Sequence, residues 1–195
     1  TAHPGLAATS MSELIALAKA RPCQLNYGSP GAGSSAHLAT EMLKSMSGMR
    51  LTHVPYKGTT PVMVDTMSGQ IQVSVLVATA VLPSIRSGKL RALGVTSAKR
   101  TPLAPDIAPV ADSVPGYEWS GWYGLAAPAG TPRGVILKLN AEVNRQLGMT
   151  DFREQIAQSG ADTLGGTPEA FAQHIRTQLD KMRLAIKVSG AKPDQ

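Results

Sequence analysis

Two loops rich in small and hydroxyl-bearing residues are the parts of this sequence best suited to bind an anion. The first, Gly28–Ser35, reads Gly-Ser-Pro-Gly-Ala-Gly-Ser-Ser, and the second, Tyr56–Thr60, reads Tyr-Lys-Gly-Thr-Thr. Each follows a predicted strand and precedes a predicted helix. Backbone N–H groups at a helix N-terminus lack an intrahelical acceptor, and the helix dipole adds positive potential there. Both loops are therefore expected to bind a negatively charged group.

The first loop also resembles two phosphate-binding patterns, each lacking one required residue. Gly28 and Gly33 have the spacing of a P-loop, but Ser34 stands where its lysine should be. Residues 31–36 fit the dinucleotide fingerprint, which also needs an acid about 20 residues later, at the end of the next strand. That strand ends in His-Val-Pro-Tyr-Lys, without an acid. Dinucleotide binding and a simple glycine turn stay open as alternatives.

Side chains in and near the two loops supply candidate contacts. Lys57 offers a positive charge or is an ordinary surface residue, and Tyr56 contacts the ligand or only packs. His37, on the first turn of the helix after the first loop, donates to a ligand carboxylate or has a surface or capping role. The other three histidines are predicted to be structural: His3, His53 and His174.

The sequence gives little support for catalysis. It contains no G-x-S-x-G elbow, no H-E-x-x-H motif and no close carboxylate pair. Its single cysteine, Cys23, cannot form an internal disulfide, and no Cys/His set has zinc spacing. On these residues we expect no enzyme, no cofactor and no metal site.

Composition sets the broad class. The 195 residues are 43% hydrophobic and 16% charged, which indicates a globular chain. The net charge of +6 suits anionic partners, but basic residues are dispersed and aromatics are only 4%, so nucleic-acid binding is not expected. No apolar run approaches a membrane span, and no signal peptide is present. The chain begins at Thr1, which indicates processing or a piece of a longer protein.

Alternating helices and strands are needed to bring the two loops together. The pattern over residues 10–96 is α-β-α-β-α-β-α-β, typical of a mostly parallel sheet covered by helices. A capping box at Ser10 opens the first helix, and Thr60-Pro61 is predicted to cap and open the third. The fourth helix is expected from Thr79 to Arg86. The predicted strands are Gln24–Tyr27, Arg50–Val54, Ile71–Val77 (expected to be central) and Arg91–Thr96.

The C-terminal part is predicted to be helical. An irregular segment at 99–115 leads to an extended stretch, 117–127, in which Trp119 and Trp122 pack in the core or between lobes, or line a ligand cleft. Helices are expected from Thr131, from Thr150 to Gly160, and from Thr167, with apolar stripes but almost no sheet to cover. This imbalance predicts that part of the molecule lies outside this sequence.

Four segments resemble one protein family: Ser29–Leu38, His53–Gly58, Gly88–Ser97 and Ala127–Pro132. Together they are similar to the tripartite tricarboxylate transporter substrate-binding proteins, also called the Bug family, and the likeness covers about Glu13 to Pro193. The resemblance implies an α/β protein of the two-lobe, type II periplasmic binding protein architecture. It implies a periplasmic solute-binding protein that captures a small carboxylate-containing molecule for a tripartite uptake system.

The resemblance also implies the binding residues. Family members hold a ligand carboxylate through backbone N–H groups, hydroxyls and ordered waters. The matching positions are Gly33, Ser34, Ser35 and His37 in the first loop and Tyr56, Lys57, Gly58 and Thr59 in the second. The family tends to carry acidic or amide residues in and just after the strand at 71–77. Here Gln72, Ser74, Leu76 and Val77 occupy that region, so the ligand's distal group is expected to be less polar than that of an amino acid or citrate.

We therefore predict two domains. Residues 1–122 form a complete second lobe with the ligand loops, and residues 123–195 form the mainly helical C-terminal part of a first lobe whose N-terminal stretch is absent. The expected partners are a small organic carboxylate and membrane transporter subunits, with a possible homodimer through exposed apolar faces. Three alternatives remain: an effector-binding domain of a transcription regulator, a dinucleotide-binding enzyme fragment, or a fragment that binds nothing.

Overall fold

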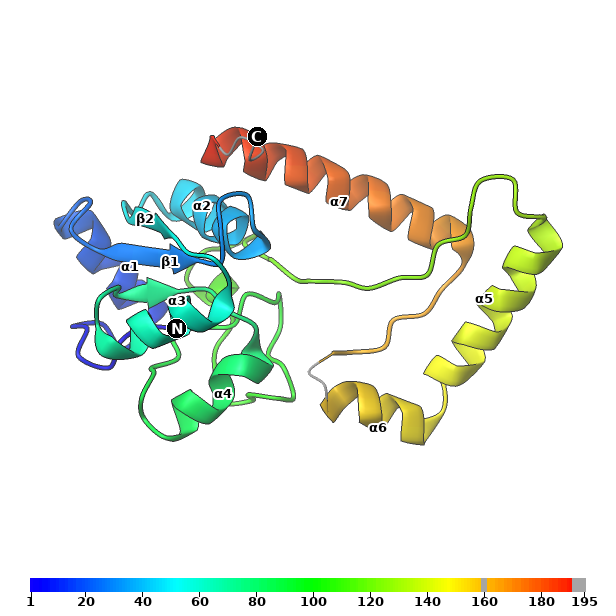
Figure 1. Ribbon diagram of the computed structural model, residues 1–195, viewed down its shortest axis with the longest axis horizontal. Helices are drawn as coiled ribbons and strands as arrows, with labels where there is room; N and C mark the ends of the chain where they lie inside the picture. Colours follow the sequence, from blue (N-terminus) through cyan, green and yellow to red (C-terminus); the bar gives the residue numbers. More distant parts are fainter. Residues whose placement is uncertain (159–160, 191–195) are drawn as a thin grey trace. The chain divides into compact units, whose positions relative to one another are not determined.

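The computed structural model describes residues 1–158 and 161–190. The chain forms two compact units (Figure 1). The sheet unit comprises residues 1–120 and, within the described part of the chain, 182–190; the helical unit comprises 121–181. The assignment of residues 1–122 and 123–195 to two lobes of a binding protein stays a prediction.

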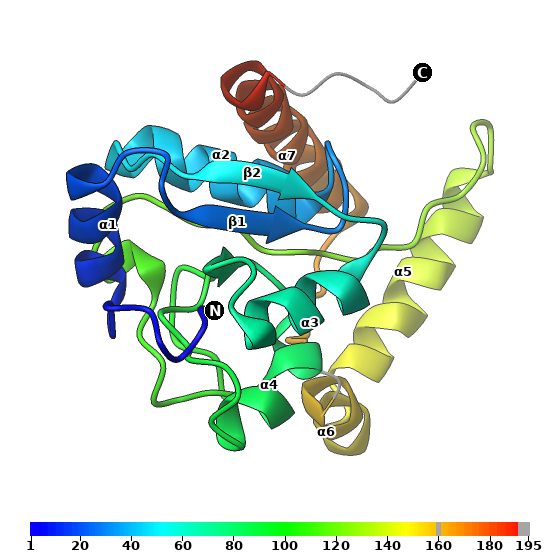
Figure 2. The ribbon, with the colours of Figure 1, turned by 60° about the vertical axis from the view of Figure 1, so that its left-hand side comes forward.

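A three-stranded parallel sheet organises the sheet unit, as the sequence predicted. The strand order is β2-β1-β3, with β1 at Asn26–Ser29, β2 at Thr52–Pro55 and β3 at Val73–Ser74. The chain crosses from β1 to β2 in one direction and from β2 to β3 in the opposite direction. Since such connections are right-handed, the helix in each crossover lies on a different face of the sheet, as Figure 2 shows. The carboxyl ends of all three strands therefore meet at one edge.

Two strand predictions need correction. The strand predicted at Ile71–Val77 as central is only two residues long and borders β1, the true central strand, on one side. Its other side pairs with Ala2, which in turn pairs with Arg91. The segment Arg91–Thr96, predicted as a strand, is not one. It forms only two isolated β-bridges, one from Arg91 to Ala2 and one from Val95 to Pro109. A proline has no N–H group, so it cannot continue a ladder.

Four α-helices surround the sheet: α1 at Met11–Ala20, α2 at Ser35–Ser47, α3 at Thr59–Ser68 and α4 at Ala78–Arg86. A short 3-10 turn at Val110–Asp112 follows. The Ser10 cap is confirmed, since its hydroxyl accepts the Glu13 N–H. The core gathers fully buried side chains from α1, β1 and the end of the unit, including Leu14, Tyr27 and Tyr117.

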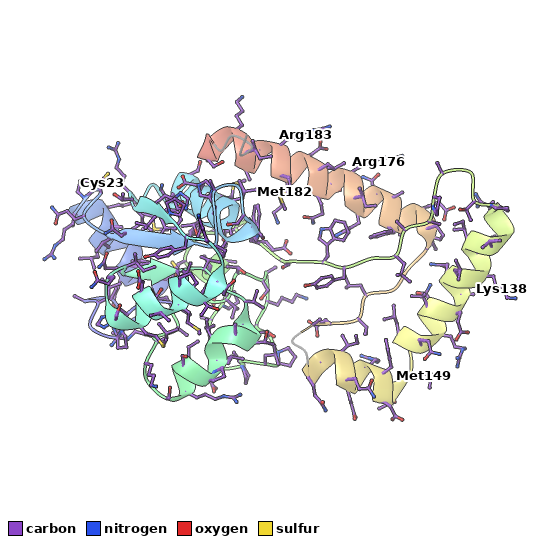
Figure 3. All side chains as sticks on the ribbon, in the orientation of Figure 1. Cys23, Lys138, Met149, Arg176, Met182 and Arg183 are labelled. Carbon is purple, nitrogen blue, oxygen red and sulfur yellow. The ribbon has the colours of Figure 1, made fainter. Side chains whose placement is uncertain are left out.

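The helical unit contains α5 at Arg133–Leu147, α6 at Thr150–Gln158 and most of α7 at Pro168–Ser189. The end predicted for α6, Gly160, lies outside the described residues. Within α5 and α6 no residue is buried, and Leu139 on the predicted stripe is 55% exposed. Figure 3 shows the side chains of this unit, among them Lys138 on α5. Among the described residues, no helix is both long and apolar enough to cross a membrane.

Candidate functional site

The two predicted loops lie side by side at the carboxyl edge of the sheet. The Tyr56 N–H donates to the Ser29 carbonyl across 2.9 Å, and the Gly58 N–H donates to the Pro30 carbonyl across 3.0 Å. Strand β1 extends two residues further than predicted, so Ser29 belongs to the strand and is fully buried. The sheet therefore fixes the first loop, 30–34, directly against the second, 56–58, and the helices that follow begin close together.

The N-terminus of α2 presents two adjacent backbone donors. Ser34 is its N-cap: the Ser34 N–H donates to the Gly31 carbonyl, and the Ser34 hydroxyl accepts the His37 N–H at 3.3 Å. The helix geometry leaves the N–H groups of the next two residues, Ser35 and Ala36, without an intrahelical acceptor. A carboxylate is the kind of group that such a pair binds.

The N-terminus of α3 repeats this arrangement, with a correction to the predicted start. The N-cap is Gly58, at φ 108°, and not Thr60. Since the Gly58 N–H already binds the first loop, the chain must turn there in a conformation that favours glycine. Pro61 falls at the third helical position, where it lacks an N–H. The N–H groups of Thr59 and Thr60 are the ones left open.

A third helix N-terminus, predicted from the sequence at Thr79, was not among the candidate binding elements. Strand β3 ends at Ser74, and α4 begins at Ala78 with Val77 as N-cap and no side-chain cap. The N–H groups of its first two residues, Ala78 and Thr79, are therefore open at the same edge. The continuous apolar run favoured a strand three residues too long, to Val77, whereas the helix start was predicted within one residue.

The predicted histidine is part of a buried column of rings. The His37 side chain is 5% exposed, and its Nδ1 accepts the Gly33 N–H at 2.9 Å. Its ring stacks on His53 with centroids 4.0 Å apart, and His53 stacks on Tyr27 at 4.8 Å. The hydrogen bond from the Gly33 N–H to the His37 ring stabilises the first loop at Gly33, whose φ is 74°. It also places the ring proton of neutral His37 on Nε2.

Both column histidines are neutral at pH 7. Burial lowers the pKa of His37, and burial together with the neighbouring His37 lowers the pKa of His53 to about 4. His53 Nε2 lies 2.7 Å from the Ser29 hydroxyl, which donates to the Gly31 carbonyl, so the imidazole is the donor of that pair. Glu41 accepts the Tyr27 hydroxyl and pairs with Lys44 at 2.6 Å, beside the column.

We expect the protein to lose stability as the pH falls from about 6.5 to about 4. In this window an unfolded His53 binds a proton and the folded one does not, so the proton favours unfolding. Each such histidine contributes a slope of at most about 1.4 kcal/mol per pH unit. Urea unfolding at several pH values, compared between wild type and His53→Gln, measures it. Identical slopes in the two proteins would contradict the assignment.

In the second loop, the side chain of Tyr56 bonds to α3, whereas that of Lys57 is exposed to solvent. The Tyr56 hydroxyl donates to Asp65 Oδ2 on α3 at 2.8 Å, and burial together with this bond raises the pKa of Tyr56 to about 12. The Lys57 side chain is exposed. The ring of Tyr56 therefore packs against α3, while the lysine contributes positive charge near the open donors of Thr59 and Thr60.

Other reactive groups belong to other elements of the structure. Cys23 is exposed near the opposite end of β1 (Figure 3). In the helical unit, His174 and Phe171 contact Trp122 edge-on. Within residues 1–158 and 161–190 no cluster of three or more His, Cys, Asp or Glu side chains could hold a metal ion.

Comparison with known proteins identifies relatives over nearly the whole chain. Residues 2–190 match the model of a family described as the tripartite tricarboxylate transporter family receptor. A relative from Pseudomonas sp. (strain P51), described as a "UPF0065 protein in tcbD-tcbE intergenic region", is 35% identical over 178 residues, which are 90% of this chain and 53% of the relative.

Two solved structures share the fold. An R. palustris protein solved with adipate has a TM-score of 0.83 and 34% identity, covering 99% of this chain and 65% of that one. The periplasmic binding protein BugD has a TM-score of 0.76 and 31% identity, covering 98% and 65%. This chain thus spans between about half and two thirds of these relatives' length. The α/β fold of a periplasmic binding protein, predicted from the sequence, is confirmed.

Proposed function

Because the chain belongs to the tripartite tricarboxylate transporter receptor family, we propose that it binds a small aliphatic carboxylate at the carboxyl edge of its sheet. The family's receptors and solved relatives are binding proteins and not enzymes. The adipate bound by one relative supports a ligand with two carboxylates joined by an apolar chain. Such a ligand also fits the expectation of a distal group less polar than that of an amino acid or citrate.

One observation carries this proposal: the hydrogen bond that ties Gly58 to Pro30 and so joins the N-termini of α2 and α3. Because of this bond, the open N–H groups of Ser35 and Ala36 and those of Thr59 and Thr60 follow two loops that lie side by side. Four backbone donors and two positive helix-dipole ends favour a carboxylate over a neutral or cationic group. Charge-assisted hydrogen bonds of this kind are stronger than neutral ones.

The candidate residues take distinct roles in this proposal. Ser35 and Thr59 contribute backbone N–H groups and hydroxyls directly. Ser34, Gly58 and the remaining candidates shape the loops or add charge: Gly33, His37, Tyr56 and Lys57. In the whole protein, residues 1–122 supply these loops as the second lobe, and closure against a first lobe that includes residues 123–195 excludes water from the ligand.

The cellular setting follows from the same relatives. BugD is a periplasmic binding protein, and we extend that location to this chain. The partners are then the membrane components of a tripartite uptake system, to which the receptor delivers its ligand. Association of two copies through the exposed apolar residues of α5 and α7 stays a prediction.

Calorimetric titration with adipate tests the proposed function. We expect adipate to bind, while 1,6-diaminohexane of the same chain length and NADH do not, because the edge presents hydrogen-bond donors and positive charge. Binding of the diamine or of NADH without adipate would contradict the proposal. NADH binding would favour the dinucleotide alternative.

A further inference from the structure

A tryptophan far along the chain contacts the ligand edge. The indole N–H of Trp119 donates to the hydroxyl of Ser35 across 2.8 Å, although the two residues are 84 positions apart. The Trp119 side chain is 5% exposed, and its backbone N–H donates to the Thr96 carbonyl at 2.7 Å. Ser35 is exposed at the first position of α2. A rigidly held donor therefore occupies one side of an accessible hydroxyl.

This contact decides which way the hydroxyl can act. A serine hydroxyl has one proton and two lone pairs, whereas an indole N–H only donates. With the indole on its lone pair, Ser35 Oγ is fixed as an acceptor toward Trp119. Its proton must point away from the indole and is left for another group. The Ser34 hydroxyl is likewise an acceptor, since it accepts the His37 N–H.

We propose that Trp119 is a positioning residue that presents the Ser35 hydroxyl as a hydrogen-bond donor to the ligand carboxylate. The inference rests on the proposed function and adds a source of its specificity. Together with the open N–H groups of Ser35 and Ala36, the hydroxyl then gives the N-terminus of α2 three hydrogen-bond donors. A carboxylate satisfies all of them, while a group that must itself donate satisfies none.

Single and double variants test the proposal by adipate calorimetry. We expect Trp119→Phe, which keeps an aromatic ring but replaces the indole and its N–H, to weaken binding about 3-fold, and Ser35→Ala about 10-fold. The double variant should bind like Ser35→Ala alone, because the indole acts only through that hydroxyl. Trp122→Phe, which changes the other tryptophan, should bind like wild type.

The possible outcomes separate this inference from the proposed function. An equal loss from Trp119→Phe in the wild-type chain and in the Ser35→Ala variant would show a purely structural role and overturn the inference, as would wild-type binding by Trp119→Phe. If the wild-type chain binds no adipate, the proposed function fails and the inference with it. In the absence of ligand, Ser35→Ala should shift one of the two indole N–H resonances; two unmoved signals would contradict the contact itself.

Discussion

Thr59→Pro should weaken adipate binding about 10- to 100-fold while leaving the melting temperature unchanged. Proline at the first helical position removes the backbone N–H together with the threonine hydroxyl, and its fixed φ suits that position. The preceding residue, Gly58, has ψ 175°, which a following proline tolerates. Each hydrogen bond to a charged group is worth about 1.5–3 kcal/mol, and about 1.4 kcal/mol is a factor of ten. Calorimetry with adipate measures the loss.

Thr59→Ala is the matched control for this experiment, because it removes the hydroxyl and keeps the N–H. If the backbone donor binds the carboxylate, Thr59→Ala loses much less affinity than Thr59→Pro. Equal losses would assign the contact to the side chain. Full binding by Thr59→Pro, with the fold intact by circular dichroism, would remove the α3 N-terminus from the site.

Gly28→Ala should destabilise the protein by about 1–3 kcal/mol, because the site is built on a strand that has no room for a side chain. An added Cβ would come within 2.3 Å of Ile71 Cδ1 and 2.9 Å of Val62 Cγ1. Both side chains are buried, at 2% and 0% exposure, so neither has free space to move into. Urea unfolding, followed by far-UV circular dichroism, measures the change.

The same substitution at Gly134 provides the comparison. A Cβ there meets no atom within 4 Å, and Gly134 lies in α5, where alanine is preferred to glycine by up to about 1 kcal/mol. Gly134→Ala should therefore leave stability unchanged or raise it. A Gly28→Ala variant as stable as wild type would show that β1 and its neighbours repack at no cost.

The sequence predicted most of the architecture because short-range signals determine it. The serine cap at Ser10 is a local signal, and the structure places it where expected. Alternation of strands with helices was sufficient to predict a parallel sheet. The four family segments predicted the family, which the match over 2–190 confirms.

Features that depend on contacts across the chain escaped prediction. Helix α3 begins at Thr59 and not at the predicted Pro61, because the Gly58 N–H donates to the Pro30 carbonyl in the other loop. The strand expected at Arg91–Thr96 is broken because its two bridges lead to different segments, Ala2 and Pro109. The contact of Trp119 with Ser35 has no local signal at all. Long-range pairing, not propensity, sets each of these.

The most direct test of the central claim follows the backbone amide signals during an adipate titration by ¹⁵N–¹H NMR. The account predicts that the largest shifts fall on the paired donors at the two helix N-termini: Ser35, Ala36, Thr59 and Thr60. These signals should move together, with a single dissociation constant. Saturable adipate binding that leaves these four amides unmoved, with the largest shifts elsewhere in the chain, would contradict it.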